Sequence, residues 1–177
     1  VNFVIYSPEN SSIRNFEREG QIQPLGINGE GLFKLLKVLA ETQPEKLQKI
    51  NDKLRLIEWF DGFEMPTGLV ADQAYLKIKD RHLDETLQNF DQRSSNEGFL
   101  FLLFYFTLFI ADETPKFFAV DNIDAALNPK LAAKLMQELV ALSKEHDKQV
   151  ILTTHNPALL DGLDLTDDEV RLFVAYR

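Results

Sequence analysis

The clearest pattern along the chain is a pair of short apolar runs with an amphipathic segment between them. The first run, Phe117–Val120, is followed at once by Asp121, and the second run ends in His155. Asn128 and Pro129 can cap and begin a helix in the intervening segment. Its leucines recur at helical spacing, at Leu131, Leu135, Leu139 and Leu142. A strand, a helix and a strand of these lengths predict a βαβ unit with two parallel strands.

Apolar spacing also predicts elements on the amino-terminal side of this unit. Residues 2–7 are typical of a strand, and the glycine-rich residues 20–31 predict a loop. Two amphipathic helices follow, and residues 42–45 predict a capping box at the start of the second. Their apolar positions are Leu32, Leu35, Leu36 and Leu39, then Leu47, Ile50, Leu54 and Ile57. We expect the two helices to form a hairpin beside the sheet.

The rest of the chain completes a mixed architecture. Residues 62–68 predict a connection, and residues 74–79 and 87–92 predict an antiparallel hairpin. The apolar stretch up to Ile110 is too short to span a bilayer, so it predicts a buried helix over residues 97–110. A short helix from Pro157 to Gly162 and a final strand over residues 169–177 should follow. We therefore expect an α/β domain with a largely parallel sheet flanked by helices, and with the helical hairpin and the β-hairpin attached.

Composition narrows the class of protein. The chain has 177 residues, which fit one domain, and its 45% hydrophobic and 27% charged content is typical of a globular protein. The net charge of -9 excludes a surface that binds nucleic acid all over, although a local basic patch stays open. The absence of cysteine excludes disulfides and thiolate metal sites and suits the cytoplasm, and no signal-peptide pattern is visible. His82 and His146 have polar neighbours and are expected at the surface.

Three motifs around the predicted βαβ unit carry a family resemblance. Phe117 to Asp121 resembles a Walker B strand, an apolar run closed by an aspartate directed to Mg²⁺. Residues 124–129 are similar to the D-loop of ABC-type ATPases, and residues 152–157 resemble their switch-histidine strand. The set resembles the RecF-like, SMC-like and OLD-like branch of AAA-type ATPases, often found in DNA repair and phage defence. The resemblance implies a P-loop NTPase-like fold, ATP and Mg²⁺ as cofactors, Asp121 at the metal and His155 at the γ-phosphate or the attacking water.

Position 122 departs from the family pattern. Most ABC-type ATPases carry a glutamate there that polarises the attacking water, whereas this chain has Asn122. An amide cannot accept a proton, so Asn122 is no general base. Three interpretations stay open: slow hydrolysis, a water oriented by Asp124, or a nucleotide-binding switch without turnover. Asp121 as a capping residue, Asp124 as a turn residue and His155 as a structural residue are the corresponding non-catalytic alternatives.

A second candidate site precedes the predicted buried helix. The five residues Ser94, Ser95, Asn96, Glu97 and Gly98 resemble a degenerate ABC signature motif and stand where the family places it, just before the Walker B strand. A serine hydroxyl and free amides at a helix start form an anion site. The resemblance implies that this site closes over the nucleotide of the opposite subunit. The alternative is an ordinary helix cap.

The phosphate loop of the family is missing from this sequence. No Gly-Lys pair occurs, and residues 26–31 contain glycines but no following Lys-Ser or Lys-Thr. We therefore interpret the chain as the carboxyl-terminal part of a nucleotide-binding domain, whose phosphate loop lies outside this sequence, and expect the chain alone to be inactive. The rival is a degenerate domain that never had such a loop.

The predicted function is ATP binding and hydrolysis in a RecF/SMC/OLD-like ATPase. In the full-length protein, two copies would form a homodimer with ATP between them, and the movement would act on DNA or an effector protein. No membrane partner is expected. The competing class is a non-enzymatic interaction or switch domain, which Asn122 and the missing phosphate loop favour. A Mg²⁺-dependent nuclease would need more clustered carboxylates than Asp121 and Asp124 provide.

Overall fold

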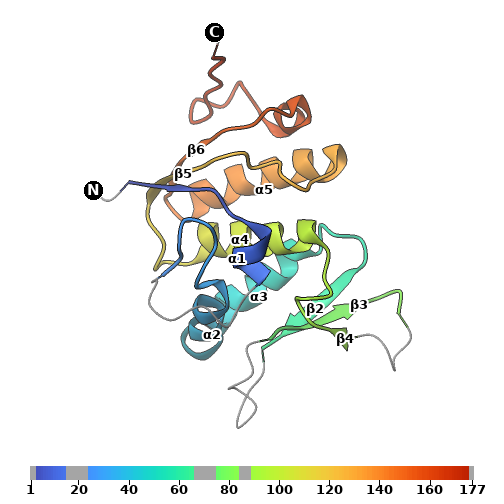
Figure 1. Cartoon of the computed structure of the whole chain (residues 1–177). Helices are drawn as coiled ribbons and strands as arrows, with labels where there is room; N and C mark the ends of the chain where they lie inside the picture. Colours follow the sequence, from blue (N-terminus) through green and yellow to red (C-terminus); the bar gives the residue numbers. More distant parts are fainter. Residues whose placement is uncertain (1–2, 15–23, 66–74, 84–88, 176–177) are drawn as a thin grey trace.

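The predicted βαβ unit is present and forms one side of the domain (Figure 1). The computed structural model describes residues 3–14, 24–65, 75–83 and 89–175. Strand β5 (Phe117–Val120), helix α5 (Pro129–Glu145) and strand β6 (Gln149–Leu152) follow one another, and β5 and β6 are parallel. Strand β1 (Val4–Tyr6) pairs with β5 on its other side, also in parallel, so the order is β1-β5-β6. The α/β class with a parallel sheet flanked by helices is confirmed.

Asn128 begins α5 as predicted. Its side-chain oxygen accepts a hydrogen bond from the Leu131 amide at 2.9 Å, and Pro129 occupies the first turn, where a missing N–H costs nothing. The inward positions of the helix are apolar, and they are Ala132, Leu135, Met136, Leu139 and Leu142. The cap and the leucine spacing therefore account for both the start and the buried face of α5.

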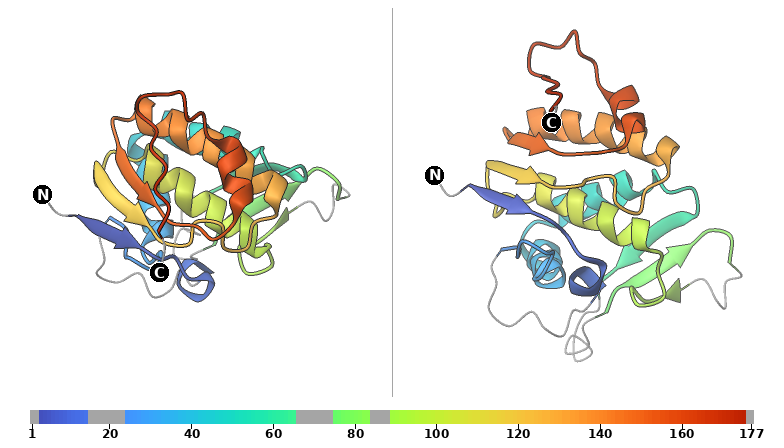
Figure 2. Two further views of the ribbon diagram at one scale, coloured as in Figure 1. Left: turned by 90° about the horizontal axis from the view of Figure 1, so that it is seen from above. Right: turned by 45° about the horizontal axis from the view of Figure 1, so that its top comes forward.

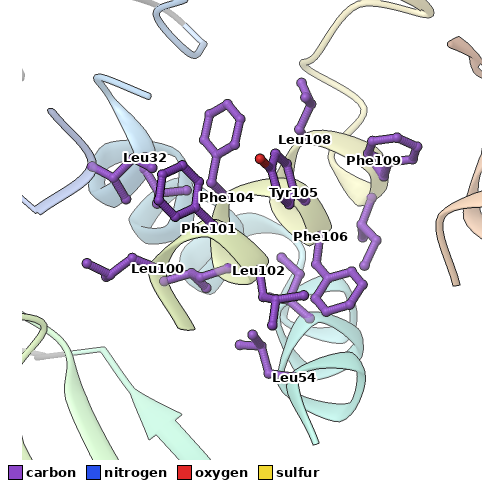
Figure 3. Close-up of a cluster of buried hydrophobic side chains, with 14 of the residues drawn as sticks. Leu32, Leu54, Leu100, Phe101, Leu102, Phe104, Tyr105, Phe106, Leu108 and Phe109 are labelled. Atoms are coloured by element: carbon purple, nitrogen blue, oxygen red, sulfur yellow. The ribbon is translucent and has the colours of Figure 1, made fainter. Parts of the chain in front are cut away.

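Helix α4 (Glu97–Ile110) is the buried core of the domain, with the predicted bounds. Every residue from Phe99 onward in the helix is buried, because its apolar side chains point in all directions around the axis. Figure 3 shows these side chains projecting from all sides of the ribbon. Phe109 meets Phe118 of β5 edge-on at 5.3 Å between ring centroids, which fixes the helix against one face of the sheet.

The predicted helical hairpin is present, but it does not lie beside the parallel sheet. Helices α2 (Leu32–Thr42) and α3 (Pro44–Leu54) both contact α4, which lies between them and β5 and β6 (Figure 1). The all-round apolar surface of α4 explains this difference, because such a helix needs a layer on each side.

The predicted capping box at residues 42–45 is wrong. Thr42 is still the last residue of α2, and its hydroxyl donates a hydrogen bond to the Val38 carbonyl at 2.7 Å. Gln43 stands at the cap position of α3 and makes no side-chain cap bond. The helix start is set instead by Pro44, whose fixed φ favours the first turn. Thr42 therefore belongs to the end of α2 and not to the cap of α3.

A second, antiparallel sheet packs near the start of α4. Strands β3 (Lys77–Asp80) and β4 (Asn89–Phe90) form the predicted hairpin, and β2 (Phe60–Glu64) adds a third strand in the order β2-β3-β4. The predicted connection over residues 62–68 is therefore wrong up to Glu64, and residues 66–68 lie outside the described residues. Pairing with β3 makes this segment a strand, and the side chain of Asn51 of α3 also bonds both the N–H and the C=O of Phe63, at 2.9 Å and 3.3 Å.

The carboxyl-terminal region matches the prediction only in part. Residues Pro157–Gly162 form the predicted short helix, a 3-10 helix named η3, which packs along α5 (Figure 2). The final strand predicted over residues 169–177 is wrong for its described part: residues 169–175 form no strand, and Phe173 is 88% exposed. An alternating apolar pattern makes a segment suitable for a strand, but the strand forms only where a neighbouring strand satisfies its backbone hydrogen bonds.

One face of the parallel sheet stays open over the described part of the chain. Ile5, Ala119 and Ile151 stand in register across the three strands, and Ile5 and Ile151 are 56% and 51% exposed. Phe3 packs on Phe117 of β5 at 4.7 Å between ring centroids. Strands of parallel sheets are normally covered on both faces. This apolar row is therefore a surface on which a further layer of structure fits.

Lys148 closes the carboxyl-terminal end of α4. Its ammonium group donates hydrogen bonds to the carbonyls of Leu108 at 2.7 Å and Ala111 at 2.9 Å, and to the hydroxyl of Thr114. The last carbonyls of a helix lack partners within the helix, so a buried donor stabilises them. The side chain is buried, and this burial lowers the pKa of Lys148 to about 7.

We expect Lys148→Met to change how the stability of this chain depends on pH. Since the pKa of Lys148 falls from 10.5 to about 7 on folding, the unfolded chain binds more protons between these values. This group therefore makes the free energy of unfolding rise with pH in that window, by at most about 1.4 kcal/mol per pH unit. Urea denaturation of both proteins at pH 6.5, 8 and 9.5, roughly spanning the window, tests it. The free energy of unfolding of wild type minus that of Lys148→Met should increase with pH. A difference that does not change with pH would contradict the burial of the ammonium group.

Candidate functional site

Asp121 lies at the edge of the sheet where β5 ends. Its amide donates to the Tyr6 carbonyl at 2.8 Å, which ties the end of β5 to the end of β1. Its carboxylate is exposed, and one oxygen accepts a hydrogen bond from the hydroxyl of Thr153, which follows β6. Ligands of open α/β sheets bind outside the carboxyl ends of the strands. The carboxylate is therefore fixed at the position where a ligand would meet it.

Asn122 makes a sharp turn directly after Asp121. Its φ of 53° lies in the left-handed region, which asparagine tolerates better than most residues. The backbone N–H of Asn122 donates to the Thr153 hydroxyl at 2.9 Å. The same hydroxyl therefore bonds the Asp121 carboxylate and the Asn122 backbone at once. The turn leaves the Asn122 side chain exposed beside the carboxylate.

Thr153 and Thr154 are site residues that sequence reasoning missed. The backbone of Thr153 continues the hydrogen bonding between β5 and β6. Its N–H donates to the Val120 carbonyl at 3.0 Å, and its carbonyl accepts from the Ile123 N–H at 3.1 Å. The Thr154 hydroxyl donates to the carboxylate of Asp124. Two consecutive hydroxyls at the end of β6 thus hold the two acidic residues that follow β5. The available signal was the pair of threonines itself, directly before His155.

Asp124 belongs to a tight turn between β5 and α5. The Leu127 amide donates to the Asp124 carbonyl at 3.1 Å, and Ala126 has a left-handed φ of 62°. Asp124 is half-buried, and its carboxylate is already bonded to Thr154. The backbone of Asp124 therefore forms a turn, as the alternative interpretation states. Its carboxylate is bonded to Thr154, the residue directly before His155.

His155 is exposed at the same edge of the sheet. Asn156, its neighbour, donates its amide to the Thr154 hydroxyl at 3.0 Å and caps η3 by accepting from the Ala158 amide at 3.0 Å. These bonds fix the backbone on the carboxyl side of His155. Within the described residues its ring makes no hydrogen bond, so the imidazole is free to meet a ligand at the edge.

The other two histidines differ from each other. His82 is exposed, as predicted. His146 is half-buried at the end of α5, with Lys49 Nζ 3.5 Å from its Nε2, so the prediction of a surface residue is wrong in part. Burial, and next the charge of Lys49, hold the pKa of His146 below its usual value. Neither histidine belongs to the edge where β5 and β6 end.

The signature-like residues form the turn into α4. The Ser94 hydroxyl is 3.3 Å from an Asp91 carboxylate oxygen, and the buried Ser95 hydroxyl donates to the Gln92 carbonyl at 2.8 Å. Asn96 caps the helix by accepting from the Phe99 amide at 2.8 Å. Within the described residues, the amides of Glu97 and Gly98 have no acceptor. The free groups of this helix start are therefore amides rather than serine hydroxyls.

The signature-like turn and the D-loop-like turn meet. A Cβ at Gly98 would lie 3.2 Å from the Ala126 carbonyl oxygen, so the two turns are close enough that a side chain there would require one of them to shift by a few tenths of an ångström. Both turns line a groove of about 510 Å³. Its lining includes Trp59, Asn96, Gly98, Ala126, Asn128 and Lys134. Asp121, Asn122, Asp124 and His155 lie outside this lining, so the D-loop-like turn connects the edge of the sheet to the groove.

The residues at the sheet edge fit a magnesium ion that is shared with a nucleotide. Among the described residues, no group of three or more His, Cys, Asp or Glu side chains could hold a metal ion by itself. Mg²⁺ usually keeps several waters and is bound by one or two carboxylates together with substrate phosphates. The exposed Asp121 carboxylate, with one oxygen engaged by Thr153, would supply one such ligand.

The fold is that of an α/β domain of the P-loop NTPase-like class. A family model described as "AAA domain, putative AbiEii toxin, Type IV TA system" matches residues 13–161, which is most of the chain. The chain belongs to this family. No described helix is long and apolar enough to cross a membrane.

A solved structure has a similar fold. It is the Smc head domain of Pyrococcus furiosus with an extended coiled coil, bound to the C-terminal domain of ScpA. The TM-score is 0.54 at 16% sequence identity, and the match covers 74% of this chain and 33% of the Smc chain. The chain thus spans about a third of the length of the structure it matches, and the likeness concerns the fold. A search of curated proteins found no match.

Proposed function

We propose that this chain is the carboxyl-terminal part of an ATP-binding and ATP-hydrolysing domain of a RecF/SMC/OLD-like ATPase. The observation that carries the proposal is the arrangement at the sheet edge, where Thr153 and Thr154 hold Asp121 and Asp124 beside His155. The AAA-domain family and the Smc-like fold support the class. Such domains power DNA repair or phage defence, and the toxin named in the family description favours defence.

Each edge residue has a role in this proposal. Asp121 contacts Mg²⁺, and His155 bonds the γ-phosphate or the attacking water. Asn122 orients that water through its amide and takes no proton from it. Asp124 is held by Thr154 and assists in orienting the water. Mg-ATP supplies the phosphoryl group and the charge that these side chains stabilise.

The phosphate loop is proposed to come from a segment outside this sequence. The open sheet face with Ile5 and Ile151 suits a further helix, and the outer edge of β6, to which no described strand is paired, suits a further strand. The amides of Glu97 and Gly98, at the groove, suit the nucleotide of a second copy. The assembled protein is then a cytoplasmic homodimer with ATP between its copies, acting on DNA or on an effector protein.

The alternative function is a nucleotide-binding switch or interaction domain without turnover. Asn122 favours it, because the position next to the metal-directed carboxylate carries an amide instead of a base. The two functions differ in one respect: the switch binds Mg-ATP and releases no phosphate.

Calorimetric titration with Mg-ATP tests the proposed nucleotide site. We expect micromolar affinity for the full-length protein and affinity at least about 100-fold weaker for this chain, because a phosphate loop supplies most of the amides and the lysine that hold the phosphates. Titration with Mg²⁺ alone is the control for metal binding. Micromolar binding by this chain would show that its main phosphate site is already present; no binding by the full-length protein would defeat the proposed function.

A further inference from the structure

Arg14 joins two parts of the chain that are far apart in sequence. It is the last residue of α1 (Asn10–Arg14), and one guanidinium nitrogen, Nη1, donates to three carbonyls of the turn that precedes α4. These are the carbonyls of Gln92 at 2.8 Å, Arg93 at 2.7 Å and Ser95 at 3.0 Å. The Nε atom donates to the Asn10 side chain at 3.0 Å, which fixes the guanidinium on α1. The bonds span 78 to 81 residues of sequence.

The turn is held from its opposite side as well. One oxygen of Asp91 accepts the amides of Arg93 and Ser94 at 3.0 Å and 3.1 Å. The carbonyls of the turn thus face Arg14, while its first amides face Asp91. A planar guanidinium can donate in several fixed directions, whereas a lysine ammonium is a compact charge on a flexible stem. Arginine suits this place because Nε bonds Asn10 while Nη1, with two hydrogens shared among three carbonyls, bonds the turn, and the rigid plane joins the two sets of bonds.

The position of this turn sets the start of α4. Ser95 is directly followed by Asn96, which caps the helix, and by Glu97 and Gly98, whose amides have no acceptor among the described residues. These residues line the groove that the D-loop-like turn also lines. The guanidinium of Arg14 also adds positive charge behind the helix start, where an anion is favoured.

We propose that Arg14 is a positioning residue that fixes the turn of residues 92–95 and thereby sets the nucleotide-facing start of α4. This inference rests on the proposed function, in which Glu97 and Gly98 meet the nucleotide of a second copy. Arg14 lies on the segment that follows β1, so it couples the edge of the parallel sheet to the groove. It touches no nucleotide itself, and it acts through the carbonyls of the turn.

The first test needs no nucleotide and uses this chain. Hydrogen exchange of the hydrogen-bonded amides of Arg93, Ser94 and Phe99 is measured in wild type, Arg14→Met, Arg14→Lys and the control Arg55→Met, whose arginine is exposed and pairs with Asp52. We expect exchange at this turn to rise at least about tenfold in Arg14→Met, less in Arg14→Lys and not in Arg55→Met, with α5 unchanged. Unchanged exchange at the turn, or an equal rise throughout the chain, would overturn the positioning role.

The second test uses the full-length protein and measures dimerisation separately from ATP binding by the monomer. We expect Arg14→Met to weaken Mg-ATP-dependent dimerisation at least about tenfold in sedimentation, while ATP affinity of the monomer stays within about twofold, because the turn faces the nucleotide of the other copy. A merely structural residue would lower both together. Wild type that never dimerises with ATP would defeat the proposed function, whereas wild-type dimerisation by Arg14→Met would overturn the inference about Arg14 alone.

Discussion

Replacing Asp121 by asparagine should abolish Mg²⁺-dependent ATP turnover in the full-length protein while leaving the fold intact. The change removes the one carboxylate that stands exposed at the end of β5 and is held there by Thr153. We expect steady-state phosphate release to fall by about 100-fold or more, which corresponds to roughly 2.7 kcal/mol of transition-state stabilisation. The fold should survive, because the amide oxygen of asparagine can still accept the hydrogen bond from the Thr153 hydroxyl.

The matched control for this substitution is Asp147→Asn. Asp147 is exposed after the end of α5 and has a φ of 52°, a conformation that asparagine also tolerates. The turnover and thermal stability of Asp147→Asn should match those of wild type. If Asp121→Asn kept wild-type turnover with an unchanged melting temperature, Asp121 would not be the metal-directed aspartate. Wild-type protein that binds Mg-ATP without releasing phosphate would instead favour the switch.

Local patterns predicted the elements that depend on a single segment. The bounds of α4 follow from its unbroken apolar stretch and from Asn96, which caps it. The unit from β5 to β6 follows from two apolar runs and the capped helix between them. In each case the sequence contains both the apolar surface and the residue that starts the element, so no distant partner is needed to specify it.

Elements that depend on distant partners could not be predicted in this way. Strand β2 contains a glycine and alternates poorly, and it is completed by Asn51, which bonds Phe63 from α3. The opposite case is residues 169–175, which alternate well but have no strand beside them in the described part of the chain. Strand propensity describes how well a side chain packs on a pleated surface. Whether the segment becomes a strand depends on a partner strand.

The candidate site shows the same division. Asp121 and His155 could be placed at one edge because the carboxyl ends of parallel strands meet there. The bonds of Thr153 and Thr154 to the acidic residues depend on the register of β5 with β6, which the sequence does not state. The contact of Arg14 with the turn before α4 spans an even longer separation. The position of Asp121 at the end of its own strand was therefore predictable, whereas the bonds between segments were not.

The close packing of η3 on α5 should leave no room for a side chain at Gly162. A Cβ at Gly162 would lie 2.2 Å from the Ala133 carbonyl oxygen and 2.9 Å from the Met136 Cβ, and both atoms belong to the rigid helix α5. The two elements must therefore move apart in Gly162→Ala. We expect a loss of about 3 kcal/mol in the free energy of unfolding and a fall of roughly 6–12 °C in melting temperature.

Gly62→Ala is the control for this prediction. A Cβ at Gly62 would meet only the Asn51 side chain at 3.7 Å, an ordinary contact, so its stability should stay within about 1 kcal/mol of wild type. Thermal and urea denaturation of the three proteins measures both effects. Because η3 begins two residues after His155, Gly162→Ala should also displace the histidine from the edge where Asp121 stands. Equal stability of the two variants would mean that η3 is not anchored on α5, and that His155 is positioned by Thr154 and Asn156 alone.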